Sequence, residues 1–173
     1  MRIILGIDPG SRKCGYGLID SAGNKLNYLA SGVIKVESKN FPERLSIIFT
    51  ELSQIIDQYH PQIAAVEEVF MGRNASSALK LGQARGAALV ACSNKGVDVA
   101  EYSARKVKQA LVGSGKADKH QMKSMITTLL RLDSVPQEDA ADALSIAVCH
   151  ANTEATMIKM SGISSRRRSG RYS

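Results

Sequence analysis

The chain has 173 residues, a length that suits a single domain with a substantial hydrophobic core. Hydrophobic residues make up 44% and charged residues 23%, which excludes disordered and fibrous classes, and the apolar runs are too short to cross a membrane. A net charge of +7 favours a polyanionic partner. The three cysteines are too widely spaced for a zinc or disulfide motif, so we expect a reducing, cytoplasmic location.

The first third of the chain has the pattern of strands. Residues 3–8 form a short apolar run, and residues 15–20 and 27–36 follow at the spacing of a hairpin. Apolar residues then recur at helical spacing over 45–59, with a proline near the start and another after the end, which predicts an amphipathic helix.

The remainder alternates short strands with helices. One predicted helix is rich in Ala and Gly, and another begins with a possible capping box, Asp118 with Gln121. In chain order we expect strands at 63–66 and 97–102, and helices at 76–92, 103–112, 118–131 and 137–151.

This order predicts an α/β fold, with a sheet of mixed strand direction and helices on both of its faces. We expect the folded domain to span residues 1–152. Periodicity is lost from Thr153 onward, and the segment 153–173 holds five basic residues and one acidic residue, so we expect a basic, disordered tail there.

Four acidic residues occupy unusual positions. Asp8 and Glu67 each end an apolar strand, where a buried charge needs compensation. Asp139 and Asp142 stand three residues apart on the last helix, so both can point the same way. If the two strands are parallel neighbours, Asp8 and Glu67 meet at one edge of the sheet, and the helix end can add the other two carboxylates.

Four carboxylates facing one cavity would repel one another strongly without cations. Oxygen ligands favour Mg²⁺, with Mn²⁺ as a substitute, over zinc. Two Mg²⁺ ions per subunit, about 4 Å apart, could activate a water and stabilise the leaving oxyanion in phosphodiester hydrolysis. The candidate catalytic and metal-binding residues are thus Asp8, Glu67, Asp139 and Asp142.

Each of these residues also has a structural interpretation. Asp139 in a first helical turn would by itself favour the helix dipole, Asp142 could be a solvated helix residue, and Glu68 could take the place of Glu67. Asp8 is the hardest to explain otherwise, because Asp is unfavourable in a strand.

The charge of the middle segment indicates nucleic-acid binding. Residues 73–123 carry ten basic and three acidic residues, whereas 124–152 carries one basic and four acidic residues. Phe70, close after Glu67 and followed by Gly72, could stack on an unpaired base or belong to the core. The other candidates for contact with DNA are Arg73, Asn74, Lys80, Arg85, Lys108, Lys116 and Lys119.

Taken together, these motifs resemble the RuvC family of Holliday-junction resolvases, which have the ribonuclease-H-like fold. The resemblance extends from Ile3 to about His150. The segments that carry it are 3–12, 67–71, 78–86, 107–109 and 139–144.

The resemblance implies roles and partners. The four carboxylates match the family's metal-binding residues, Phe70 its junction-stacking aromatic residue, and Lys108 and Lys119 its DNA-contacting lysines. It implies a homodimer that resolves a four-way DNA junction by symmetric cuts in two strands, leaving 5′-phosphate and 3′-hydroxyl ends, with a preference for a thymine-containing sequence. It also implies work alongside the branch-migration proteins RuvA and RuvB.

The stretch Ala78–Ala91, which is rich in Ala and Gly, is expected to lie at or near the dimer interface. Its small side chains would let two helices approach closely, and a two-fold dimer would present two sites to a two-fold symmetric junction. The alternative is that the small residues pack against the core of the same chain.

Other functions fit parts of the sequence. A ribonuclease-H-like nuclease that acts on structured RNA would share the fold, although the dense carboxylate set and Phe70 argue against it. A non-catalytic junction-binding adaptor would not need all four carboxylates. An actin-like ATPase has a similar Asp-x-Gly phosphate loop, but it requires two such domains and a longer chain.

Overall fold

The computed structural model describes residues 2–23, 25–68 and 74–169, with side chains up to residue 161. A five-stranded sheet with the order β3-β2-β1-β4-β5 forms its centre. The strands are β1 (Arg2–Asp8), β2 (Lys13–Ala22), β3 (Lys25–Lys35), β4 (Ile63–Glu67) and β5 (Asp98–Tyr102). The helices are α1 (Phe41–Tyr59), α2 (Ala75–Asn94), α3 (Ala104–Val112), α4 (Lys119–Leu129) and α5 (Glu138–Ser169).

The sheet has mixed strand direction, as expected. Strand β1 pairs with β2 antiparallel and with β4 parallel, β2 pairs with β3 antiparallel, and β4 pairs with β5 parallel. The carboxyl ends of β1, β4 and β5 therefore lie at one edge of the sheet, which we call the carboxyl edge.

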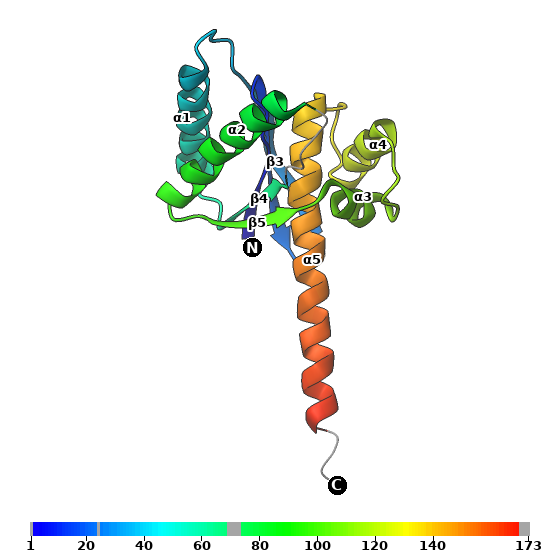
Figure 1. The fold of residues 1–173 in the computed structure, drawn as a ribbon. Coiled ribbons are helices and arrows are strands. Elements are labelled where there is room, and N and C mark those ends of the chain that lie inside the picture. The colour runs from blue at the N-terminus through cyan, green and yellow to red at the C-terminus, as the bar shows by residue number, and fades with distance from the viewer. Residues whose placement is uncertain (1, 24, 69–73, 170–173) are drawn as a thin grey trace.

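Helices cover both faces of the sheet (Figure 1). One core lies between the sheet and α1 with α2, and it includes Leu5, Val66 and Ala88. The other lies between the sheet and α3, α4 and α5, and it includes Ile4, Ala65 and Leu144. The two cores confirm the α/β architecture predicted from the chain order.

Helix α5 lies directly against the sheet because glycines remove the side chains that would separate them. A Cβ atom on Gly6 would lie 1.9 Å from the carbonyl oxygen of Ala143, and one on Gly15 would lie 2.0 Å from that of Asp139. A Cβ on Gly17 would lie 2.7 Å from the Leu144 side chain. Such distances exclude any larger residue unless the helix moves outward.

The start of two helices agrees with the sequence signals. The Ser103 side chain accepts a hydrogen bond from the Lys106 backbone N–H before α3. Asp118 and Gln121 form the expected capping box before α4. These caps position the helices that carry Lys108 and Lys119.

The expected end of the last helix near residue 151 is wrong, because α5 continues to Ser169 and projects beyond the sheet (Figure 1). Glu154 forms an ion pair with Arg2, and the Thr153 hydroxyl donates to the Cys149 carbonyl oxygen. Met157 is 63% exposed. A helix that leaves the core has no buried face, so it loses apolar periodicity without losing its backbone hydrogen bonds.

None of the helices in the described ranges is long and apolar enough to span a bilayer.

We expect Gly6→Ala to lower the free energy of unfolding by about 1–3 kcal/mol or more, because its methyl group would press against the Ala143 carbonyl. Gly82→Ala on α2 is the matched control. It meets nothing within 4 Å and should raise stability by up to about 1 kcal/mol, as Ala does in place of Gly within a helix. Urea denaturation of both variants measures the difference, and a Gly6→Ala protein as stable as the wild type would contradict it.

Candidate active site

The alternation of side chains along β1 and β4 points Asp8 and Glu67 to the same face. Ile4 on β1 and Ala65 on β4 belong to the core beneath α5, and their neighbours Leu5 and Ala64 belong to the opposite core. With a repeat of two residues, Asp8 follows Ile4 and Glu67 follows Ala65 onto the α5 face. Since Ile7 pairs with Val66 in the parallel ladder, the two carboxylates end adjacent strands.

Helix α5 brings Asp139 to the same place. Asp8 pairs with Gly15 across the antiparallel ladder, and the Asp139 backbone rests on Gly15. Asp142 follows three residues later on the same helix, which is close to one turn. The sheet edge and the first turns of α5 thus converge on one site, which we call the carboxylate site.

The charges of the other three carboxylates act on Asp8. Burial has the largest effect and the charges of Asp142, Glu67 and Asp139 add to it, in that order, so that the pKa of Asp8 rises from its ordinary value of 3.8 to about 7. Lys119 has the opposite, smaller effect. Glu67 is therefore the member of the Glu67–Glu68 pair that belongs to the site.

Burial also raises the pKa of Glu67 and that of Asp142. For Glu67 the Asp142 charge adds to this effect, while Lys108 and Lys119 oppose it. For Asp142 the nearby Lys119 opposes it. The side chain of Lys119, which is exposed, forms an ion pair with Glu138. The structure thus places the two lysines Lys108 and Lys119 beside the carboxylate site.

The donor set fits a divalent cation with a preference for oxygen. All four side chains are carboxylates, and a bound cation would offset the repulsion that Asp142, Glu67 and Asp139 exert on Asp8. Within the described residues, no three acidic, histidine or cysteine side chains converge closely enough to hold an ion as they stand.

The remaining candidates for DNA contact differ in their surroundings. Asn74 caps α2 by accepting from the Ser77 N–H. Arg85 forms an ion pair with Glu101 and donates to the Glu67 carbonyl oxygen at 3.3 Å, so it is a structural support of the site. Lys80 and Lys116 are exposed. Phe70 and Arg73 lie outside the described residues.

The sequence reasoning missed the glycines on which α5 rests. Gly15 and Gly17 are two residues apart in a strand, where glycine is unfavourable, and Gly6 pairs with Gly17 across the ladder. A repeat of two places Gly15 and Gly17 on one face. That spacing was the available signal that another backbone approaches the sheet there.

In the metal-free protein, the raised pKa of Asp8 should make stability depend on pH. The folded state keeps the Asp8 proton up to about pH 7, whereas the unfolded chain releases it near its ordinary pKa. Because the folded state binds more protons between these values, the free energy of unfolding falls as pH rises from about 4 to about 7. Asp8→Asn should lose less stability over this interval and be the more stable protein at pH 8.

Thermal unfolding in the presence of EDTA tests this expectation. Asp98→Asn, an exposed residue at the start of β5, is the control and should follow the wild type. If the melting temperatures of the wild type and Asp8→Asn changed with pH in the same way, the raised pKa assigned to Asp8 would be contradicted.

Comparisons with known proteins identify relatives along nearly the full length. The family "Crossover junction endodeoxyribonuclease RuvC" matches residues 4–150. A crossover junction endodeoxyribonuclease RuvC of Teredinibacter turnerae is 56% identical over 173 residues, covering 97% of this chain and 98% of its own length. One of Photobacterium profundum is 55% identical over 172 residues and covers 99% of both chains.

Solved structures agree with these relatives. RuvC of T. thermophilus, solved in complex with a Holliday junction substrate, matches with a TM-score of 0.85 and 34% identity, covering 90% of this chain and 96% of that one. The yeast mitochondrial Holliday junction resolvase Ydc2 matches with a TM-score of 0.68 at 12% identity, over 94% of this chain and 85% of that one, and so shows a common fold alone. The ribonuclease-H-like fold implied by the resemblance is confirmed, and the chain belongs to the family of crossover junction endodeoxyribonuclease RuvC.

Proposed function

We propose that this protein resolves Holliday junctions by cutting two strands of a four-way DNA junction at the carboxylate site. The observation that carries the proposal is the convergence of Asp8, Glu67, Asp139 and Asp142 at one sheet edge, in a chain whose family is named for this endonuclease activity. Charge supports a DNA substrate, because the segment 73–123 that contains Lys108 and Lys119 carries ten basic and three acidic residues.

Dependence on a divalent metal is a general feature of this family. The four carboxylates are the residues that would hold the metal, and oxygen donors favour Mg²⁺, with two ions per subunit and Mn²⁺ as a substitute. Metal ions bound there would stabilise the negative charge that develops on the phosphate and would favour ionisation of the attacking water.

The protein's own groups position the phosphodiester. Asp8 lies on the central strand and Asp139 and Asp142 on the helix that rests on it, so their backbones share one rigid frame. Lys119 acts on Asp8, Glu67 and Asp142, and Lys108 acts on Glu67. The two lysines would draw the DNA backbone toward a site whose acidic residues alone would repel it.

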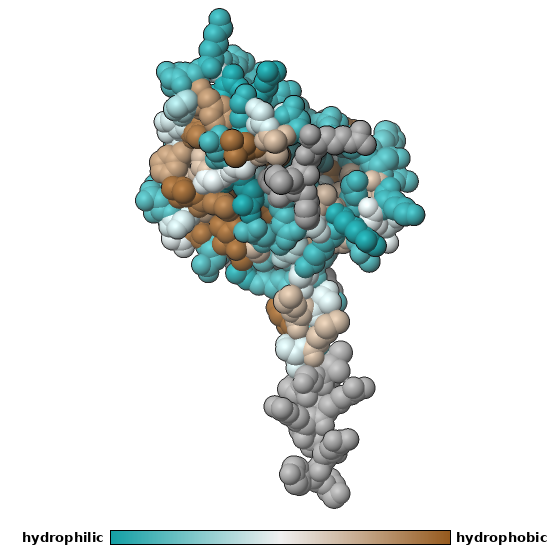
Figure 2. Space-filling model, in the orientation of Figure 1, coloured by the Kyte–Doolittle hydropathy of each residue, from teal (hydrophilic) through white to brown (hydrophobic). Residues whose placement is uncertain are grey.

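The outer face of α2 suits the homodimer interface. Ala84 and Ala88 are completely buried against the chain's own core, so the core-packing alternative is correct for them. The exposed side of the helix carries Leu79 (67% exposed) and Val90 (57%), with Gly82 and Gly86 open between them. Figure 2 shows apolar residues gathered on the face of the molecule where α2 lies. A symmetric contact through this face would pair two sites for two cuts.

The remaining parts of the proposal concern partners and surroundings. The domain of residues 1–152 would carry the catalysis, and the segment 153–173 would add general affinity for DNA through its five basic residues. RuvA and RuvB would deliver the junction, and the cytoplasm would be the place of action.

The Asp8→Asn protein should bind a synthetic four-way junction but fail to cut it in Mg²⁺. The substitution keeps the size of the side chain and removes a metal-binding charge. A loss of more than about 100-fold in cleavage rate is expected, since even groups that only support metal ligands account for 10–100-fold. Gel-shift binding and the release of nicked strands give the two readouts.

Linear duplex and an RNA–DNA hybrid are the substrate controls, and Asp98→Asn is the control variant. Cleavage of the hybrid in preference to the junction would replace DNA resolution with an RNA-directed function. A junction that the wild-type protein binds in Mg²⁺ but leaves uncut would favour a non-catalytic adaptor.

Leu79→Glu and Val90→Glu should each weaken the dimer by placing a charge in an apolar contact. Sedimentation velocity measures the shift toward monomer, which should appear as a rise of at least about tenfold in the dimer dissociation constant. Met157→Glu changes an equally exposed apolar residue on the projecting part of α5 and should leave the mass unchanged. Dimers of wild-type affinity in both α2 variants would rule this face out.

A further inference from the structure

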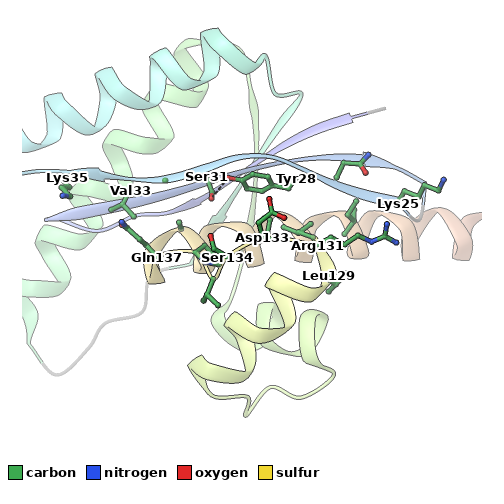
Figure 3. A pocket seen from close by; sticks show the side chains of 18 residues that line it. Lys25, Tyr28, Ser31, Val33, Lys35, Leu129, Arg131, Asp133, Ser134 and Gln137 are labelled. Carbon is green, nitrogen blue, oxygen red and sulfur yellow. Dashed lines mark hydrogen bonds between the residues drawn. The ribbon is translucent and has the colours of Figure 1, made fainter.

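A separate groove lies on the α5 face of the sheet, beside the carboxylate site. It has a volume of about 1130 Å³ and runs between β3 and the segment 129–137 that connects α4 to α5. Figure 3 shows Tyr28, Ser31, Val33 and Lys35 along the β3 wall, with Asp133 on the opposite wall. The four carboxylates do not line it, so the groove needs an explanation of its own.

A β-bulge directs the β3 side chains into this groove. Tyr28 pairs with Ile19 and Ala30 pairs with Leu18, so Leu29 is an extra residue in the ladder. The extra residue restores Tyr28 and Ser31 to the same face, although they are three positions apart. Their hydroxyl groups lie 3.2 Å from each other in a hydrogen bond. The bulge therefore produces a polar wall along most of β3.

One end of the groove adjoins the carboxylate site. Gly15 pairs with Asp8 on one side and with Val33 on the other. Two strand spacings of about 4.8 Å therefore separate Val33 from Asp8, or about 10 Å. A polymer bound at Asp8 and leaving along the α5 face would enter the groove at this end.

Both ends of the groove are basic. Near the carboxylate site, Lys35 pairs directly with Lys13 across the ladder, and both side chains are exposed. Like charges placed opposite each other in a sheet are destabilising, so this pair would be stabilised by an anion. At the far end, Lys25 and Arg131 lie on opposite walls (Figure 3).

These cations are available to a ligand. Within the described residues, Lys13, Lys25, Lys35 and Arg131 have no ion-pair partner within 4.0 Å. The acidic residue Asp133 lies between the two ends, facing the β3 wall. The ends thus attract anions while the middle does not.

We propose that this groove is a second DNA-binding site, which holds one strand of the duplex arm that leaves the carboxylate site. The strand's phosphates contact Lys13 and Lys35 at the near end and Lys25 and Arg131 at the far end. The half-exposed ring of Tyr28 and the Ser31 hydroxyl face the sugars between them. This inference rests on the proposed function for the identity of the nucleic acid.

The length of β3 predicts how much DNA the groove requires. Ten residue steps separate Lys25 from Lys35, or about 33 Å at 3.3 Å per residue. At 3.4 Å per base pair this corresponds to about ten base pairs. The far-end contacts should therefore form only with arms of at least that length.

The test compares Lys25→Gln and Arg131→Gln, each combined with Asp8→Asn so that DNA is bound without being cut. Lys95→Gln is the matched control, because Lys95 follows α2 on the other face of the sheet and the substitution removes the same charge. Binding is measured to junctions with arms of about 20 and about 6 base pairs over a series of salt concentrations. Thermal unfolding confirms that each variant is folded.

We expect each far-end variant to lower the salt slope of long-arm binding by about 0.9, the value for one phosphate contact. Short-arm binding should be unchanged, and hydroxyl-radical protection of the long arm should recede at its outer end. Asp133→Asn should tighten long-arm binding. Lys95→Gln should leave the salt slope, the hydroxyl-radical protection and the affinity for long arms unchanged.

Unchanged long-arm binding in both far-end variants would overturn the proposal, and the groove would then suit a different occupant, such as a protein partner. Equal losses of binding affinity for junctions with long and with short arms would overturn it as well. Because these are binding measurements, they remain informative if the wild-type protein fails to cut junctions, an outcome that would refute the proposed function instead.

Discussion

The close approach of α5 to the sheet fixes where the acidic groups of this molecule lie. Gly6 and Gly15 let the helix backbone rest on β1 and β2, where a Cβ atom would lie about 2 Å from helix carbonyl oxygens. This contact holds Asp139 and Asp142 beside the ends of β1 and β4. A helix pushed outward by larger side chains would carry its two carboxylates away from Asp8 and Glu67, and the site would lose half of its acidic groups without losing the fold.

The same contact explains why the site is electrostatically strained. Burial and three neighbouring carboxylates raise the pKa of Asp8 to about 7, which is an unfavourable arrangement for stability and a favourable one for binding a divalent cation. Lys108 from the middle of α3 and Lys119 from the start of α4 oppose the rise in the pKa of the neighbouring carboxyl groups. The site holds groups that folding alone would not select, and the two well-formed cores on either side of the sheet compensate for their cost in stability.

Different faces of α2, α5 and the sheet make different contacts. Helix α2 buries Ala84 and Ala88 against the core and leaves Leu79 and Val90 outside, so one helix would serve both packing and association. Helix α5 is buried from Ala140 to Ala151, apart from the partly buried Asp142, and then continues away from the domain. On the other side of α5, the bulge in β3 forms the wall of a groove that begins about 10 Å from Asp8. Substrate, partner subunit and DNA arm would thus use different faces of one rigid sheet.

The order of the elements, the mixed direction of the sheet and the candidate carboxylates could be predicted from the sequence, because apolar periodicity, caps and the ends of strands are local signals. It favoured Glu67 without excluding Glu68, and it could not decide which face of α2 is buried or where α5 ends. Those questions depend on neighbours distant in the chain: the register of β4 against β1, the packing of α2 on the sheet, and the ion pair of Arg2 with Glu154. The role of Gly15 depends on the nearby α5 backbone, and the β3 bulge depends on the register of β3 against β2, so neither could be predicted from local sequence.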